Sequence, residues 1–182
     1  IAGAARGAGL GVRFLKHLTR TRILLHVVDI CPIDGSDVIA NITQLNKELA
    51  DFSAALAERP RWLVLNKTDL LSDELVQAKR LEVAQAFPEL KQIYTISTVA
   101  RAGLDELKQT AMTALESIWQ NEQLDPEALA LEHDIQRRMQ TQSRETIAHL
   151  AEQRKAHRKA QTAINQDDED DDHDIEIEYV SD

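Results

Sequence analysis

The chain is predicted to adopt an α/β fold, a parallel sheet with flanking helices, and two observations predict it. Short apolar runs of strand length alternate with longer segments whose apolar residues recur at helical spacing. Such alternation indicates parallel strands joined by right-handed helical crossovers. The composition agrees, because 182 residues that are 43% hydrophobic and 29% charged can bury one core of ordinary size.

The net charge of -10 is concentrated at the carboxyl end. Ten of the 31 acidic residues lie within 167–182, where no Lys or Arg occurs, so the other 21 acids balance the 21 bases. Self-repulsion predicts that this tail is disordered. No apolar run approaches the roughly 20 residues of a membrane span. The single cysteine, Cys31, excludes an internal disulfide. We therefore expect a cytoplasmic monomer that does not bind membranes.

The first elements are a helix and a strand. The helix is predicted from apolar residues at helical spacing: Leu10, Phe14, Leu15 and Leu18. The Gly-rich residues 1–11 before it lack a Gly-Lys-Ser/Thr ending and follow no strand, which argues against a phosphate-binding loop. Residues 23–29 form an apolar run typical of a central parallel strand. His26 within it is interpreted as a satisfied core histidine, since no partner Cys or His is spaced for a metal.

Asp29 ends this strand, where it can either contribute to a site or cap the next loop. After a turn at 32–35, Ser36 is the predicted N-cap of a second helix. The apolar residues expected to face inward on that helix are Val38, Ile42, Leu45, Leu49 and Phe52.

The stretch from Trp62 to Asp69 contains the polar residues that point to a ligand-binding site. An apolar strand, 62–65, ends in Asn66, Lys67 and Asp69. Ligands in open α/β sheets bind at the carboxyl ends of strands, so a site is expected here. The Asp69 carboxylate can accept two parallel hydrogen bonds from guanine, whereas adenine would leave it unpaired. Asn66 can bond the base edge or tie neighbouring loops, and the Lys67 stem can lie over the ring.

Three further elements follow. Ser72 is the predicted cap of a helix with apolar positions Leu75, Leu81, Val83 and Phe87. Residues 92–97 read as a third strand, which ends in Ser97, Thr98 and Val99. The apolar positions of the helix after it are Leu104, Leu107, Ala111, Leu115 and Ile118.

The composition changes beyond residue 120. We divide the chain into a domain at 1–120, a polar helical extension at 121–166 and the acidic tail at 167–182. The basic residues 154–159 either contact nucleic acid or are a plain exposed helix end. The closing residues 175–180 alternate like a strand.

With these motifs identified, residues 1 to about 118 resemble the Obg family of GTPases, bacterial proteins tied to assembly of the large ribosomal subunit. Four segments carry the resemblance. Residues 1–11 are similar to the family's second switch, and residues 25–29 with 32–35 are similar to its next strand and loop. Residues 60–69 resemble the guanine motif, and residues 97–99 fall where the family has its last nucleotide motif.

The resemblance implies a partial P-loop-type GTPase fold that binds GTP or GDP. The binding residues it implies are Asn66, Lys67, Thr68, Asp69, Ser97, Thr98 and Val99. Thr98 stands where the family usually has Ala, which is compatible with a contact through the backbone N–H. The phosphate loop and the Mg²⁺ ligands are expected upstream of Ile1, so no catalytic or metal-binding residue is assigned here. The implied partner is the large ribosomal subunit, through its rRNA and proteins.

Two functions compete at this point. In the first, the chain is the carboxyl-terminal part of a GTPase, inactive alone, that hydrolyses GTP to GDP when the protein is intact. In the second, it is a non-catalytic module that binds a partner through its helical extension and tail, with a vestigial nucleotide pocket. A start at Ile1 is unusual for translation, so we expect a fragment of a longer protein.

Overall fold

The predicted alternation of strands and helices is present in the computed structural model, which describes residues 11–170. The elements are α1 (Gly11–Leu18), β1 (Leu24–Asp29), α2 (Val38–Phe52), α3 (Ala54–Ala57), β2 (Arg61–Asn66), η2 (Thr68–Leu70), α4 (Asp73–Ala86), β3 (Ile93–Thr95), α5 (Leu104–Leu124) and α6 (Pro126–Asp170). The switch-like residues 1–10 and the tail residues 171–182 lie outside the described part, so the predictions made for them stay predictions.

The strands form one parallel sheet in the order β1-β2-β3. The prediction of a central strand at 23–29 is therefore wrong for the described residues, because β2 is central and β1 lies at the edge. The apolar run had indicated burial on both faces. In β1, however, Leu25 and Val27 are 46% and 57% exposed, while Leu24 and Val28 are buried on the other face.

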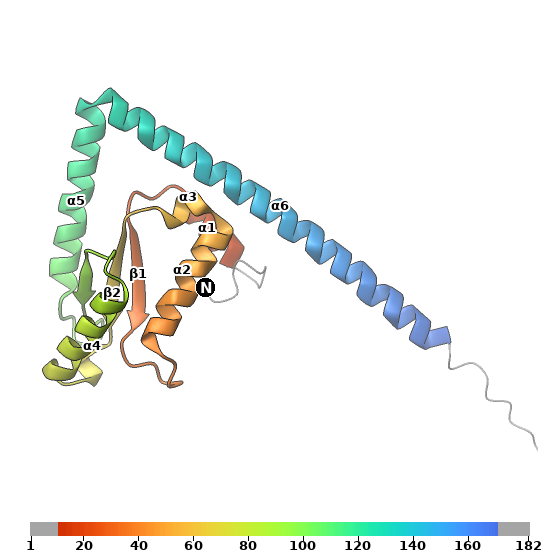
Figure 1. The fold of residues 1–182 in the computed structure, drawn as a ribbon, viewed down its shortest axis with the longest axis horizontal. Helices are drawn as coiled ribbons and strands as arrows, with labels where there is room; N and C mark the ends of the chain where they lie inside the picture. Colours follow the sequence, from red (N-terminus) through yellow and green to blue (C-terminus); the bar gives the residue numbers. More distant parts are fainter. Residues whose placement is uncertain (1–10, 171–182) are drawn as a thin grey trace, which may run out of the picture. The chain divides into compact units, whose positions relative to one another are not determined.

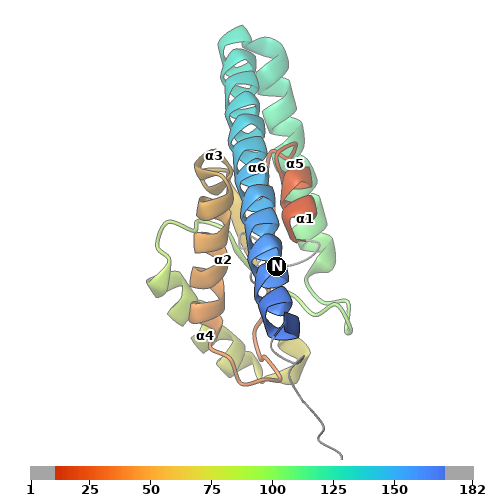
Figure 2. The ribbon, with the colours of Figure 1, turned by 90° about the vertical axis from the view of Figure 1, so that its right-hand side faces the viewer.

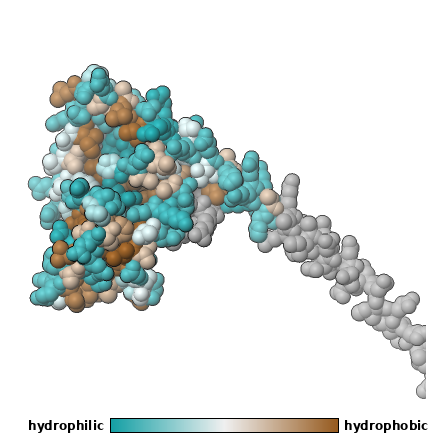
Figure 3. Space-filling view, viewed as in Figure 1, coloured by the Kyte–Doolittle hydropathy of each residue, from teal (hydrophilic) through white to brown (hydrophobic). Residues whose placement is uncertain are grey.

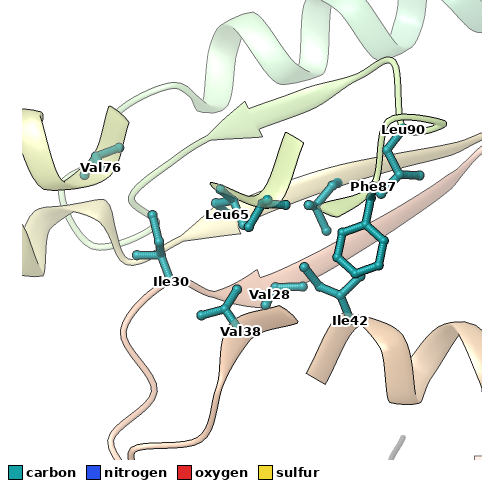
Figure 4. Packing of buried hydrophobic residues seen from close by; sticks show 10 residues of the cluster. Val28, Ile30, Val38, Ile42, Leu65, Val76, Phe87 and Leu90 are labelled. Carbon is teal, nitrogen blue, oxygen red and sulfur yellow. The ribbon is translucent and has the colours of Figure 1, made fainter. Parts of the chain in front are cut away.

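The larger core lies on the face of the sheet that α2 and α4 cover. Figure 1 shows α2 on one side of the sheet and α5 on the other. Figure 4 shows how side chains from β1, β2, α2 and the segment after α4 converge. The buried members of this cluster are Val28, Ile30, Val38, Ile42, Leu63, Leu65, Val76, Val83, Phe87 and Leu90.

A smaller core lies beneath α5. Trp62, Val64, Ile96 and Leu107 are its buried members, and the ring centroids of Trp62 and Tyr94 are 5.4 Å apart. The predicted inward face of α5 is confirmed, since Leu107 is buried and the other four predicted positions are half-buried. Figure 3, which is viewed as in Figure 1, shows apolar patches among hydrophilic ones on the face turned to the viewer. The exposed apolar side chains of α5 include Met112, Trp119 and Leu124.

The sequence predicted the N-cap residue correctly for α4 but not for α2. Ser72 caps α4 as predicted, accepting from the Leu75 N–H at 3.5 Å. The N-cap of α2 is Asp37 and not Ser36, because the Asp37 carboxylate accepts from the Ala40 N–H at 2.7 Å. The Ser36 hydroxyl instead accepts from the amide of Asn41 at 2.8 Å. The helix thus begins one residue later than predicted.

The apolar positions named from the sequence agree with the observed burial better in α2 than in α4. Four of the five predicted positions of α2 are buried, and Leu45 is half-buried. Of the four apolar positions named for α4, Val83 and Phe87 are buried, whereas Leu75 and Leu81 are 53% and 58% exposed. Val76, seven residues before Val83 and so on the same helix face, is also buried in the core. Figure 2 shows the short helix α3 directly after the end of α2. Ser53 lies between the two helices, as the C-cap of α2 and the N-cap of α3.

The described chain divides into two units, one ending at Arg144 and the other beginning at Glu145. The predicted start of the extension at 121 falls inside α5, and α6 is a single helix of 45 residues. In the first unit, Met139 of α6 is fully buried and the Glu132 side chain is only 9% exposed. None of the described helices has an apolar stretch long enough to cross a membrane.

Candidate functional site

The first half of the site is the turn that ends β2. Residues 62–65 are buried, which fixes the strand in the middle of the sheet up to Asn66. Lys67 then adopts a left-handed backbone conformation, with φ of 67°, and leads into the short helix η2. A positive φ is uncommon for a residue other than Gly, and here it turns the chain sharply at the strand end. The turn places Thr68 and Asp69 beside the end of β3.

The second half of the site is the loop after β3. Ser97 is 1% exposed, and its N–H donates to the carbonyl of Ala102 at 3.0 Å, which closes the loop. Its hydroxyl also accepts from the Ala100 N–H at 2.9 Å. Gly103 has a φ of +71°, and a Cβ there would lie 2.5 Å from the carbonyl oxygen of Thr95. Only glycine fits this close approach of the loop to the end of β3.

Hydrogen bonds tie the two halves together. The Ser97 hydroxyl donates to Oδ1 of Asp69. The backbone N–H of Thr98 donates to Oδ1 of Asn66 at 3.2 Å, and the N–H of Thr68 donates to the Ile96 carbonyl at 3.2 Å. Asn66 therefore ties neighbouring loops, which is one of the two tasks left open for it, and its bonding to a base edge stays a prediction. The result is one continuous polar rim at the carboxyl ends of β2 and β3.

All seven residues predicted for the site lie on this rim, with different exposure. Ser97 is buried, Asn66, Lys67 and Thr68 are half-buried, and Asp69, Thr98 and Val99 are exposed. Their role in binding stays a prediction. The chemistry of the rim suits a flat, polar ligand, because a carboxylate, backbone N–H groups and an aliphatic stem converge there.

Asp29 belongs to this rim too, and the sequence left its role open between a site and a loop cap. The structure shows the loop cap and a contact to Lys67, and a role in binding stays a prediction. Oδ1 accepts from the Cys31 N–H at 2.9 Å, and Oδ2 forms an ion pair with the Lys67 ammonium. The hydrogen bond to Asp29 raises the pKa of Lys67, so this side chain stays a cation. The parallel register, which sets Asp29 opposite Asn66, is the signal that could have revealed the pair.

His26 is buried as predicted, at 7% exposure, but the prediction that it is satisfied is wrong. Its Nδ1 has no hydrogen-bond partner within the described residues. Burial, with a smaller contribution from the positive charge of Arg61, lowers the pKa of His26 to about 4. The ring is therefore neutral at pH 7. The described side chains also include no group of three His, Cys, Asp or Glu that could hold a metal ion.

Comparison with known proteins shows similarity to curated proteins, among them two relatives. No protein-family model matches the chain. It is 50% identical over 115 residues to the GTPase Obg of two strains of Acidithiobacillus ferrooxidans, a match that covers 63% of this chain and 31% of each relative. The chain thus spans less than a third of the length of these curated relatives. The α/β fold with its small parallel sheet is consistent with part of a GTPase fold, and the similarity supports a GTP-binding protein of the Obg type.

Proposed function

We propose that this chain supplies the guanine-recognition part of an Obg-type GTPase. The observation that carries the proposal is the rim in which the 66–69 turn and the 97–99 loop are tied together. The bond from Ser97 uses Oδ1 of Asp69, and a carboxylate offers about four acceptor positions, so further donors can still be accepted. Such a rim is rigid before a base arrives, which limits the ordering cost of binding.

Each rim group has a proposed task. The Asp69 carboxylate accepts from the ring N–H and the exocyclic amine of guanine. The backbone N–H of Val99 donates to the guanine carbonyl oxygen and the stem of Lys67 lies over the ring, while the Thr98 N–H stays bonded to Asn66. Adenine has neither the ring N–H nor the amine in these places, so the carboxylate would keep its bond from Ser97 but lose both hydrogen bonds from the base. Unpaired polar groups are what reject near-identical ligands.

The reaction and the partners are proposals for the longer protein. There we expect hydrolysis of GTP to GDP and phosphate, with Mg²⁺, in the cytoplasm, during assembly of the large ribosomal subunit with its rRNA and proteins. The phosphate loop and the Mg²⁺ ligands are expected in the longer protein, outside this chain. Phosphoryl transfer depends on charge neutralisation around the phosphates. We therefore expect the chain alone to bind GDP only at millimolar concentration, on the order of -4 kcal/mol, and to hydrolyse no GTP.

The test is base selectivity, measured by NMR titration of the 182-residue chain with GDP, ADP and xanthosine diphosphate. The wild-type chain should prefer GDP. Asp69→Asn replaces an acceptor with an amide that can donate to the xanthine carbonyl. It should weaken GDP binding by about 1–3 kcal/mol, roughly tenfold to a hundredfold, and improve binding of the xanthine nucleotide.

Asp51→Asn is the matched control, because Asp51 is an exposed residue of α2 and the change of charge is the same. It should leave all three affinities unchanged. Equal binding of GDP and ADP by the wild-type chain, or an unaltered preference in Asp69→Asn, would refute guanine recognition by this rim.

A further inference from the structure

The ends of β1 and β2 bring together two groups that the sequence separates by 38 positions. Asp29 is the register partner of Asn66, and the Ile30 N–H donates to the Asn66 carbonyl at 3.0 Å, which extends the pairing past the end of β1. Lys67 is the next residue. Its ammonium therefore reaches Oδ2 of Asp29, across from one strand end to the other.

Asp29 is held in place by its own loop. While Oδ2 meets the lysine, Oδ1 accepts from the Cys31 N–H at 2.9 Å, and the side chain is 27% exposed. The two oxygens thus have separate tasks, one in the loop after β1 and one toward Lys67. A carboxylate anchored in this way presents a fixed charge to its partner.

The Lys67 side chain is long, so a partner at its far end is required to hold it in one position. The left-handed backbone at Lys67 sets the direction in which the side chain leaves the turn. Beyond Cβ, a lysine stem is flexible, and this one is 38% exposed. The ion pair fixes its far end, so both ends of the stem are held. The raised pKa of Lys67 agrees with this contact.

We propose that Asp29 is a positioning residue of the guanine site, which holds the Lys67 stem in place before the base binds. The inference rests on the function proposed above. A partly exposed ion pair adds little to folding stability. Ordering a flexible side chain during binding, in contrast, lowers affinity. Loss of the pair should therefore weaken guanine nucleotide binding about threefold to tenfold and leave stability nearly unchanged.

Asp29→Asn separates the two tasks of the side chain. The amide oxygen can still accept from Cys31, but the charge that attracts Lys67 is gone. Lys67→Met keeps an apolar stem and removes the ammonium. We expect each variant to weaken GDP binding in NMR titration of the 182-residue chain. In the Lys67→Met background, Asp29→Asn should add no further loss, because the interaction it removes is already absent. Asp51→Asn again serves as the charge-matched control.

The ion pair has a signature that involves no nucleotide. The Lys67 ammonium protons should exchange slowly enough to be seen by ¹⁵N NMR in the wild-type chain, and Asp29→Asn should abolish this signal and lower the pKa of Lys67. Lack of a slowly exchanging signal in the wild type would overturn the proposal, whether or not the variant folds.

The titrations also separate this proposal from the function on which it rests. A wild-type chain without preference for GDP over ADP would overturn both. A clear preference, with Asp29→Asn at wild-type affinity or with additive effects of the two variants, would overturn the role of Asp29 alone.

Discussion

Two ion pairs in the first unit use the same chemistry in different surroundings. Arg59 and Glu132 form a bidentate pair, with Nη1 to Oε2 at 2.6 Å and Nη2 to Oε1 at 2.5 Å, and their side chains are 5% and 9% exposed. Asp29 and Lys67 pair at the strand ends, with side chains 27% and 38% exposed. The first pair joins the segment after α3 to α6. The second lies on the rim of the candidate site.

The difference teaches what burial does to a charge. A buried charge that loses its ionic partner is not hydrated by water in its place, whereas an exposed charge is. Arg22 extends the buried group, since it lies 3.0 Å from Glu132 and 2.7 Å from Glu122 of α5. The buried network therefore ties α5 and α6 to the segments that carry Arg22 and Arg59. The exposed pair contributes little to stability, and its lysine is accessible to a ligand.

The largest effect is expected from Glu132→Gln. This change leaves Arg59, which is 6% exposed, as a buried charge without an anionic partner. Breaking such a pair from one side costs about 3–5 kcal/mol of unfolding free energy. Denaturant titration measures it. The double change Arg59→Met with Glu132→Leu is the control, and it should recover most of the loss because no unpaired charge remains. A single variant as stable as the wild type would mean that the network does not hold α6.

The same pair also predicts a pH dependence. Burial alone would raise the pKa of Glu132, but hydrogen bonding and the charges of Arg59 and Arg22 outweigh it and lower the pKa from its ordinary 4.5. A lowered carboxyl pKa contributes stability above the ordinary value, and this is lost as the pH falls through the folded pKa. Stability from this network should thus decline only below about pH 4.5.

His26 extends the comparison to a buried ionisable group whose Nδ1 has no hydrogen-bond partner among residues 11–170. Its pKa is lowered from 6.5 to about 4, so below pH 6.5 the unfolded chain binds a proton that the folded chain does not. Stability should then fall by about 3 kcal/mol between pH 6.5 and 4, at 1.36 kcal/mol per pKa unit. His26→Leu should flatten that part of the curve in unfolding experiments. An unchanged slope in the variant would assign the loss to other groups.

Ser97→Ala tests the rim at its most buried point. The change removes the donor to Asp69 and the acceptor for the Ala100 N–H, and it should cost about 1 kcal/mol of stability. GDP affinity should fall in parallel, because Asp69 is no longer held. Thr98→Ala is the control. The structure uses the backbone N–H of Thr98, so this variant should match the wild type in both thermal unfolding and GDP titration.

The smallest effect on stability is expected from removing residues 167–182. These residues contain ten acids and few apolar side chains, so the thermal midpoint should stay nearly unchanged. The formal charge, however, changes from -10 to zero, which should raise non-specific affinity for an RNA oligonucleotide in fluorescence anisotropy. A large fall in the midpoint would show that part of the tail packs against folded structure.

Local sequence pattern was enough to locate the strands, most helix bounds and the two polar turns of the candidate site. Strand-length apolar runs and helical spacing depend on residues close in sequence, and so does the capping of α4 by Ser72. The same patterns failed where burial depends on which neighbour covers a face. Leu75 and Leu81 were named among the apolar positions of α4, yet they are exposed, while Val76, which was not named, is buried.

What tertiary structure alone decided is which distant groups meet. The register of β1 and β2 brings Asp29 to Lys67, and the packing of α6 brings Glu132 to Arg59, 73 positions away. The sequence determined that a carboxylate and a lysine occur at strand ends, and that the extension at 121–166 favours a helix. It could not determine their partners, because residues far apart in the chain carry no local pattern that encodes their distance.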